Sequence, residues 1–286
     1  MHSVMVLKGK YAAEIKASIL ILSLFALVYL SFSLGLFARK KPISREVLYE
    51  KRTLKFEHGP HGIARESEKY LWISFPSNGT ISRLSVEDGK IDLSIPSPVK
   101  SPWGLGYFGG NLWIVDVSTS ELYCFSLENF TLIDEIDGNW TYPSAITITE
   151  EGVLWLSSLD QMRIYKIDLA YRKVVGSIKL FGVFGLDYKD GFLWTTSCDM
   201  KIRKIDPSSG KVLETFFSPG RLPTGICWTN NSLWVGDKSG FLKELEIVEG
   251  RYKLLYTEPP GWLYVLLLIA FLPILLSVGS KARRYS

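Results

Sequence analysis

Short apolar runs separated by turn residues recur through the middle of the chain. One run in each set contains a Leu-Trp dipeptide, and this dipeptide returns about every 40 residues. Runs of this length that are bounded by Gly, Pro, Asn or Asp indicate β-strands. A fixed period near 40 residues built from short strands predicts a β-propeller with one four-stranded blade per repeat. The five copies of the dipeptide are Leu71–Trp72, Leu112–Trp113, Leu154–Trp155, Leu193–Trp194 and Leu233–Trp234.

The fourth repeat illustrates the four expected strands, at residues 184–188, 192–196, 201–206 and 211–217. Its first two strands are joined through Asp-Gly, a frequent hairpin turn. The Trp of each repeat is expected to pack between adjacent blades. The pattern therefore predicts an all-β propeller of five four-stranded blades over residues 47–258. The first strand of each repeat opens on a small residue, as expected where strands crowd at the ring axis: Gly62, Gly104, Ala145, Gly185 and Gly225.

Two segments compete for the outermost strand of the fifth blade. Residues 47–56 resemble the last strand of a blade, and residues 252–256 lie where the fifth repeat would supply its own. The first segment either pairs beside the second or replaces it. A ring must join its first and last blades, because an unpaired sheet edge is a template for association. We therefore expect the two chain ends to meet at one blade, which would bring the flanking segments side by side.

Two uncharged apolar segments flank the repeats, at residues 17–38 and 259–280. Each reaches the roughly 20 residues that a helix needs to span a bilayer. We expect two transmembrane α-helices; the alternative for residues 17–38 is a cleaved secretory signal, whose apolar core is normally shorter. The other flanking segments are a basic tail at 1–16, a linker at 39–46 and a basic cytoplasmic tail at 281–286.

The basic residues Lys281, Arg283 and Arg284 place the C-terminus in the cytoplasm by the positive-inside rule, whereas the charges around the first segment are undecided. Two retained spans put both termini in the cytoplasm and the propeller on the other side of the cell membrane. Asn-x-Ser/Thr motifs in expected turns favour the same extracytoplasmic location as glycosylation candidates, although Asn, Ser and Thr gather in turns for other reasons as well. These candidates are Asn78, Asn129, Asn139 and Asn230.

The repeat units resemble a known family of propellers. The first repeat contains Pro60-His61-Gly62-Ile63, then Tyr70-Leu71-Trp72-Ile73 and Asp88-Gly89-Lys90-Ile91, and the fourth matches it. These repeats are similar to those of YVTN/NHL-type propellers, most of all the virginiamycin B lyase-like (streptogramin lyase) group. The resemblance covers residues 58 to 258 and implies the fold. Its catalytic residues are not carried over, because the lyase has seven blades and uses clustered His and Glu with magnesium, whereas the only His within residues 58 to 258 are His58 and His61. Five-bladed propellers also occur among glutaminyl cyclase-like proteins, whose motifs beyond the generic repeat are not found.

Charge distribution and Cys content limit the possible partners and sites further. The formal net charge is +4, but no Lys/Arg-rich run interleaved with aromatic residues lies between residues 55 and 258, so nucleic acid is not an expected partner. The three Cys have no metal-ligand spacing and read as small buried residues. We assign no catalytic residue, metal ligand or cofactor from the sequence.

A ligand site is expected where the loops between blades and the turns between second and third strands share one face. Aromatic residues beside Asp and Arg there could hold a carbohydrate, a peptide or a loop of a protein. The alternative is that the aromatic residues pack on neighbours such as Pro102 and that the Asp residues cap turns. The candidates for this ligand rim are His61, Trp103, Trp140, Tyr142, Phe184, Arg221, Asp116 and Asp237.

These observations predict a membrane-anchored extracytoplasmic propeller that acts as a binding or protein-interaction module. Two alternatives remain open. One is a lyase- or cyclase-like enzyme that uses the central cavity with a divalent cation. The other is a structural subunit of a membrane complex, joined through its spans.

Overall fold

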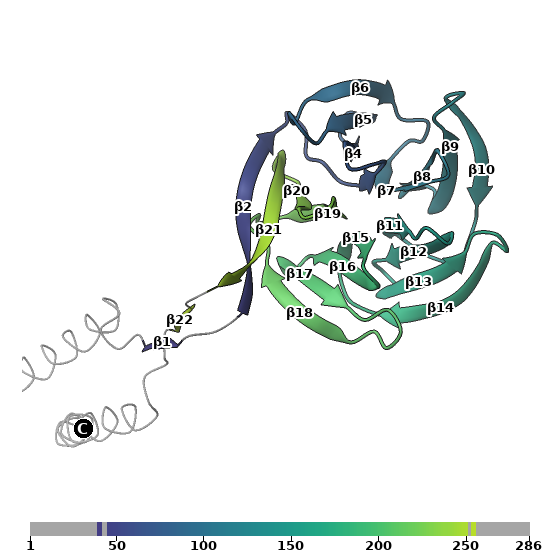
Figure 1. Cartoon of the computed structure of the whole chain (residues 1–286). Helices are drawn as coiled ribbons and strands as arrows, with labels where there is room; N and C mark the ends of the chain where they lie inside the picture. Colours follow the sequence, from purple (N-terminus) through teal and green to yellow (C-terminus); the bar gives the residue numbers. More distant parts are fainter. Residues whose placement is uncertain (1–38, 42–44, 251–252, 256–286) are drawn as a thin grey trace, which may run out of the picture. The chain divides into compact units, whose positions relative to one another are not determined.

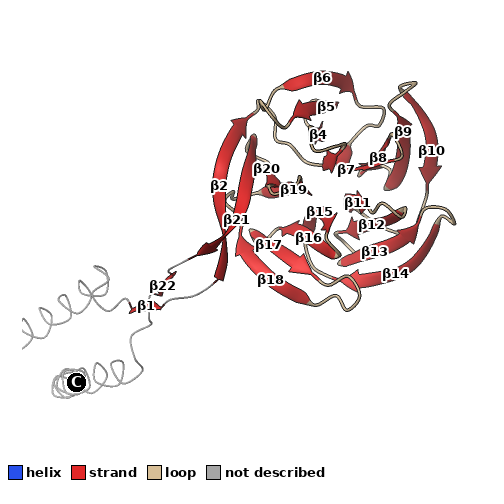
Figure 2. Ribbon diagram, in the orientation of Figure 1, coloured by secondary structure: helices blue, strands red, loops and turns tan. Residues whose placement is uncertain are grey.

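The structure, a computed structural model, describes residues 39–41, 45–250 and 253–255. Its main unit is a ring of five four-stranded antiparallel sheets around a central axis (Figure 1). Figure 2 shows only strands and loops in the described part of this chain. The five-bladed all-β propeller expected from the repeats is confirmed.

Each blade runs from an inner strand at the axis to an outer strand at the rim. Blade 1 is β3 (Ile63–Arg65), β4 (Tyr70–Phe75), β5 (Thr80–Ser85) and β6 (Ile91–Pro96). Blade 2 is β7 (Pro102–Phe108), β8 (Asn111–Asp116), β9 (Glu121–Ser126) and β10 (Thr131–Ile136). Blade 3 is β11 (Pro143–Ile148), β12 (Val153–Ser158), β13 (Arg163–Asp168) and β14 (Lys173–Lys179).

Blade 4 is β15 (Val183–Lys189), β16 (Phe192–Ser197), β17 (Lys201–Ile205) and β18 (Val212–Phe217). Blade 5 is β19 (Pro223–Trp228), β20 (Leu233–Asp237), β21 (Phe241–Gly250) and, as its outermost strand, β2 (Arg45–Lys55). The remaining strands, β1 (Arg39–Lys41) and β22 (Lys253–Leu255), pair with each other.

The ring is therefore closed by the N-terminal strand. β2 replaces residues 252–256 in blade 5, and β22 from that segment pairs with β1 instead. Arg52 holds the junction, because its guanidinium donates to Glu244 of β21 at 3.0 Å and to the carbonyl oxygens of Val86 and Glu87 in blade 1. The Phe56 amide donates to the Gly240 carbonyl at 2.7 Å.

The repeated Trp residues join neighbouring blades, as expected. Trp72 packs with Leu105 and Leu112 of blade 2. Trp234 of blade 5 packs with Ile63 and Leu71 of blade 1, so the apolar contacts also run around the closed ring. Burying these large rings between sheets supplies much of the apolar area that stabilises a propeller.

Small residues open the inner strands because backbones meet at the axis. A Cβ atom on Gly62 would lie 2.2 Å from the Trp103 carbonyl oxygen, and one on Gly225 would lie 2.1 Å from the His61 carbonyl oxygen. Both separations are far below van der Waals contact, so packing alone explains these glycines.

The propeller has two faces, which we name from its connections. The upper face carries the loops that join blades and the turns between second and third strands; the lower face carries the other turns. β2 ends at the upper face, where residues 56–62 lead into β3, and β21 begins at the upper face after β20. Glu46 and Val248, where the propeller unit begins and ends, therefore both lie at the lower face of blade 5.

No helix among the described residues is long and apolar enough to cross a membrane. The expected spans at 17–38 and 259–280 and the tails at 1–16 and 281–286 lie outside the described residues. Whether the two spans lie side by side therefore remains a prediction.

Candidate functional site

The central channel of the propeller is nearly closed at its middle, so that it has two separate mouths. Where the inner strands converge, the channel narrows to a cavity of only about 10 Å³, whose lining includes the small residues at the strand openings and Phe184. This volume is close to the minimum that one water molecule needs. The upper and lower mouths of the channel can therefore be considered separately.

Three candidate rim residues form a row of rings around the upper mouth. The His61 and Trp103 ring centroids are 5.0 Å apart, and those of Trp103 and Tyr142 are 5.6 Å apart with the rings nearly perpendicular. Burial, with a smaller contribution from the charge of Lys238, lowers the pKa of His61 to about 4. His61 is therefore neutral at physiological pH and contributes an uncharged ring to this row.

Three other candidates are not on the surface. Trp140 is buried and donates its Nε1–H to the Ser120 carbonyl oxygen at 2.7 Å. Asp116 and Asp237 are also buried, and each accepts hydrogen bonds from backbone amides of the adjoining loops, including Ser118 and Leu222. Burial opposes ionisation of both carboxyls, but hydrogen bonds from the hydroxyls of Ser118 and Ser239, together with those from the amides, hold their pKa values below the ordinary range. Both Asp residues thus hold upper-face loops in place, whereas Arg221 is exposed there.

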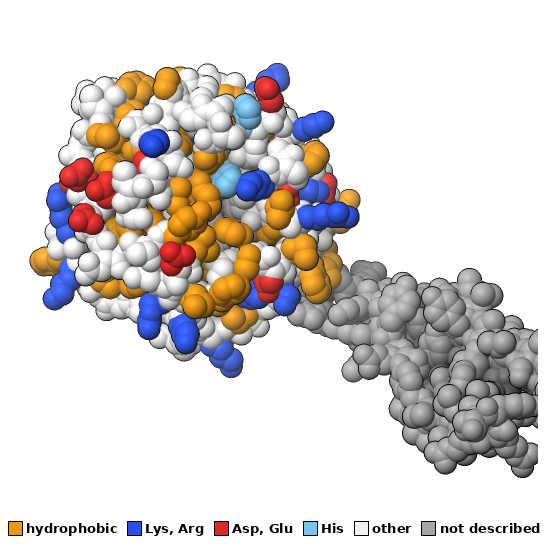
Figure 3. Space-filling model, turned by 180° about the vertical axis from the view of Figure 1, so that it is seen from behind, with side chains coloured by type: hydrophobic (Ala, Val, Ile, Leu, Met, Phe, Trp, Pro, Cys, Tyr) orange, Lys and Arg blue, Asp and Glu red, His pale blue; other side chains and the backbone are white. Residues whose placement is uncertain are grey.

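Beside the row of aromatic residues lies an exposed apolar surface, of which only Tyr142 was a candidate from the sequence. Its members lie in the upper-face loops and strand ends of blades 3 to 5. Figure 3 shows the face that carries the propeller's histidines, with apolar side chains gathered around its centre. We name this surface the upper apolar arc; its residues are Tyr142, Met162, Phe181, Met200, Phe217 and Leu222.

Backbone geometry helps to present this arc. Tyr142, Met162 and Met200 have φ angles of 51°, 51° and 59°. Residues other than glycine rarely adopt this left-handed region. Exposures of 65% for Phe181 and 77% for Phe217 mean that most of these large side chains contacts solvent. The signal in the sequence was large apolar residues at turn positions, where polar residues are usual.

The four glycosylation candidates are exposed and lie in turns or loops on both faces. Asn78 and Asn139 belong to the upper face, and Asn129 and Asn230 to the lower face. The Asn78 Oδ1 accepts hydrogen bonds from the amide and hydroxyl of Thr80, the third residue of its own motif. All four are thus accessible on the isolated propeller.

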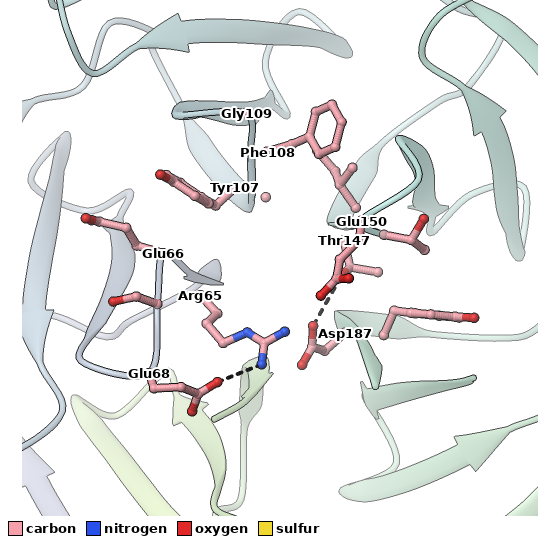
Figure 4. Close-up of a pocket in the computed structure, with 14 residues that line it drawn as sticks. Arg65, Glu66, Glu68, Tyr107, Phe108, Gly109, Thr147, Glu150 and Asp187 are labelled. Atoms are coloured by element: carbon pink, nitrogen blue, oxygen red, sulfur yellow. Dashed lines mark hydrogen bonds and ion pairs between the residues drawn. The ribbon is translucent and has the colours of Figure 1, made fainter. Parts of the chain in front are cut away.

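The lower mouth widens into a pocket of about 510 Å³ (Figure 4). We name it the lower pocket. It is formed by the ends of the inner strands of blades 1 to 4 and the turns that follow them. None of its side chains was a candidate in the sequence reading. Its polar and aromatic lining includes Arg65, Glu66, Glu68, Tyr107, Phe108, Thr147, Glu150, Asp187 and Tyr188.

Asp187 bridges three blades at the bottom of the lower pocket. Its Oδ2 accepts a hydrogen bond of 2.6 Å from the Trp228 amide of blade 5, and its Oδ1 accepts one of 3.2 Å from the Thr147 hydroxyl of blade 3. Burial raises the pKa of Asp187 to about 6, although these hydrogen bonds and the charge of Arg65 act in the opposite direction. The carboxyl group is thus ionised at neutral pH at a cost in folding stability.

The variant Asp187→Asn should therefore have a different pH dependence of stability. The native carboxyl binds its proton more tightly than the unfolded chain does, so its contribution to stability is full below about pH 4 and is lost as pH rises through about 6. We expect the unfolding free energy of wild type, relative to Asp187→Asn, to fall by roughly 2 kcal/mol between these limits. His61, with its lowered pKa, acts in the opposite sense in the same range, so denaturant titrations must compare the two proteins at each pH. A constant difference between them would contradict the prediction.

Within the described residues, no group of three or more His, Cys, Asp or Glu side chains is placed to hold a metal ion. Two carboxylates of the lower pocket already have partners within the protein. Glu66 accepts a hydrogen bond from Trp72 Nε1 at 2.7 Å, and Glu68 pairs with Arg65 at 3.0 Å.

No protein-family model matches the chain, and no curated protein matches its sequence. Among solved structures, the glutaminyl cyclase of Myxococcus xanthus matches with a TM-score of 0.60 and 15% identity, over 73% of this chain and 100% of that chain. The virginiamycin B lyase from Staphylococcus aureus matches with a TM-score of 0.48 and 16% identity, over 71% of this chain and 100% of that chain. The WD40 propeller domain of Doa1 matches with a TM-score of 0.49 and 12% identity, over 67% of this chain and 64% of that chain.

At these identities the similarity is one of fold. Virginiamycin B lyase and a streptogramin B lyase, whose repeats the sequence resembles, are both among the matching structures. The chain is thus a five-bladed β-propeller in fold.

Proposed function

We propose that this chain is a membrane-anchored binding module that holds a protein partner on the upper face of an extracytoplasmic propeller. The observation that carries the proposal is the upper apolar arc beside the row of His61, Trp103 and Tyr142. A large exposed apolar surface costs free energy in water, and contiguous patches of this kind mark interaction sites. Aromatic and Met side chains are also enriched in protein interfaces.

The topology of the ends supports the same assignment. Glu46 and Val248, where the propeller unit begins and ends, lie at the lower face of blade 5, opposite the upper apolar arc. The chain therefore enters and leaves the propeller on the side opposite the upper apolar arc. The basic segment 281–286 and the four exposed Asn motifs support a cytoplasmic tail and an outside propeller.

Site-specific photocrosslinking in the native membrane tests the binding surface. We expect p-benzoylphenylalanine at position 181, in the upper apolar arc, to give a discrete protein adduct. The same group at Tyr171, which is 82% exposed in a lower-face turn of blade 3, should give none.

A variant adds the control for specificity. Replacing Met200 and Leu222 by Ser should reduce the adduct from position 181 several-fold, because both belong to the upper apolar arc. Their exposure means that the fold should persist. Equal crosslinking from positions 181 and 171, or an adduct insensitive to the double substitution, would count against the upper face as the binding surface.

A further inference from the structure

Two opposite charges face each other across the lower pocket without pairing. Arg65 ends β3 in blade 1, and Asp187 lies in β15 of blade 4; Figure 4 shows the guanidinium directed towards the carboxylate across open space. Among the ion pairs of the described residues, which join atoms within 4.0 Å, none connects these two side chains.

Each group is held apart by a partner of its own. The Arg65 Nη1 donates to the Glu68 Oε1 at 3.0 Å. Asp187 is fixed by the Trp228 amide and the Thr147 hydroxyl. A guanidinium has five N–H donors and a carboxylate about four acceptor positions, so both retain capacity for a third molecule. The gap is therefore bounded by a donor group on one side and an acceptor group on the other.

The remaining carboxylates determine which charge is favoured there. Glu66 accepts from Trp72 Nε1 and lies 3.8 Å from Arg83, so it is partly compensated, while Glu150 is exposed at the mouth. The lower pocket therefore has an excess of negative charge. A ligand that carries only an anion is disfavoured, and a positive group beside Asp187 is favoured.

We propose that the lower pocket binds a free α-amino acid as a zwitterion. Its ammonium group would donate to Asp187, and its carboxylate would accept from the free side of the Arg65 guanidinium. The volume of about 510 Å³ lies in the usual range for small-molecule pockets. Tyr107, Phe108 and Tyr188 line the same pocket and provide apolar surface for the ligand's side chain. This site lies at the mouth opposite the upper apolar arc and is independent of the proposed partner.

Titration calorimetry on the full chain in detergent tests the proposal. The twenty common L-amino acids are titrated to about 10 mM, a range that includes weak small-molecule affinities. We expect saturable binding of at least one. Its amine and its acid, each lacking one charged group, should bind at least about tenfold more weakly, with the amine the better of the two.

Matched variants locate the site. Arg65→Gln and Asp187→Asn should each weaken binding roughly ten- to a hundredfold, because each removes one charged partner. Lys69→Gln and Asp190→Asn change the same charges at exposed positions of the adjacent lower-face turns and should bind as wild type does. Melting curves identify any variant that does not fold; if Asp187→Asn fails to fold, Arg65→Gln decides alone.

Three outcomes would overturn the proposal: no saturable binding of any amino acid, an amine that binds as tightly as its parent amino acid, or unchanged binding by folded Arg65→Gln. The Met200 and Leu222 substitutions should leave amino-acid binding intact. Failure of this site is thereby distinguished from failure of the upper-face interaction.

Discussion

A chain that begins at residue 57 should fail to form the propeller, whereas one that begins at residue 45 should fold. The shorter chain loses β2, the outermost strand of blade 5, and with it the hydrogen bonds along β21. It also loses Leu48, which packs against the core between blades 4 and 5, and Leu54 and Phe56, which pack against the core between blades 5 and 1. Burying such side chains contributes about 1.5–3 kcal/mol each when complete, so their sum with the lost strand pairing approaches the roughly 5–15 kcal/mol that stabilises a typical domain.

Circular dichroism, thermal melting and size-exclusion chromatography of the two chains measure this effect. The chain from residue 45 is the matched control, because it keeps β2 and lacks only the preceding segment. We expect a cooperative melt and a monomeric peak from it, and aggregation or a broad non-cooperative melt from the shorter chain, whose β21 edge is exposed. Equal melting of the two chains would mean that β2 does not close the ring.

Trp234→Ala should be the most destabilising single substitution that the packing suggests. Trp234 is fully buried, its Nε1–H donates to the Thr229 hydroxyl at 3.1 Å, and the Arg52 guanidinium lies 5.1 Å from its ring centroid. The ring fills the contact between blades 5 and 1. Its loss should cost about 3–5 kcal/mol, of which the cavity left behind is part.

In a domain of this size, that loss corresponds to a melting temperature lower by roughly 10 °C. Phe217→Ala is the matched aromatic control; at 77% exposure, it should change the unfolding free energy by less than about 0.5 kcal/mol. If both variants had the melting temperature of wild type, the inter-blade packing of Trp234 would be refuted.

The blade framework could be predicted from the sequence because it repeats. Trp72 and Trp234 occupy equivalent positions in their repeats, and each packs against the following blade. Ring closure could only be narrowed to two alternatives. Both segments 47–56 and 252–256 have strand composition. Local composition cannot decide whether β21 pairs with the adjacent segment 252–256 or with 47–56, which is some 200 residues away in the chain.

The lower pocket was harder to predict, because its residues come from different blades. Arg65 and Asp187 meet only when blades 1 and 4 are placed around one axis. A weak signal existed in the repeats. Two residues after each small opening residue the chain has Ala64, Gly106, Thr147, Asp187 and Cys227, of which one is acidic. An ionisable residue such as Asp187, on an inner strand close to the crowded axis, indicates a polar site.

The upper rim was predicted in part. Residue type identified His61, Trp103 and Tyr142, which the structure brings together. Residue type alone could not show that Trp140, Asp116 and Asp237 are buried, since a turn position does not determine whether a side chain points inwards. The upper apolar arc depends on loop conformations, including the left-handed backbone of Met162 and Met200, which sequence patterns specify poorly.

The central claim, that the propeller is displayed outside the cell, can be tested most directly through a thiol that the chain already carries. The expectation that all three Cys are buried is wrong for Cys198, which is exposed in an upper-face turn; Cys124 and Cys227, the other two Cys in the chain, are buried. A membrane-impermeant maleimide applied to intact cells should label wild type and leave Cys198→Ser unlabelled. Labelling of wild type only after the membrane is permeabilised would contradict the extracytoplasmic location.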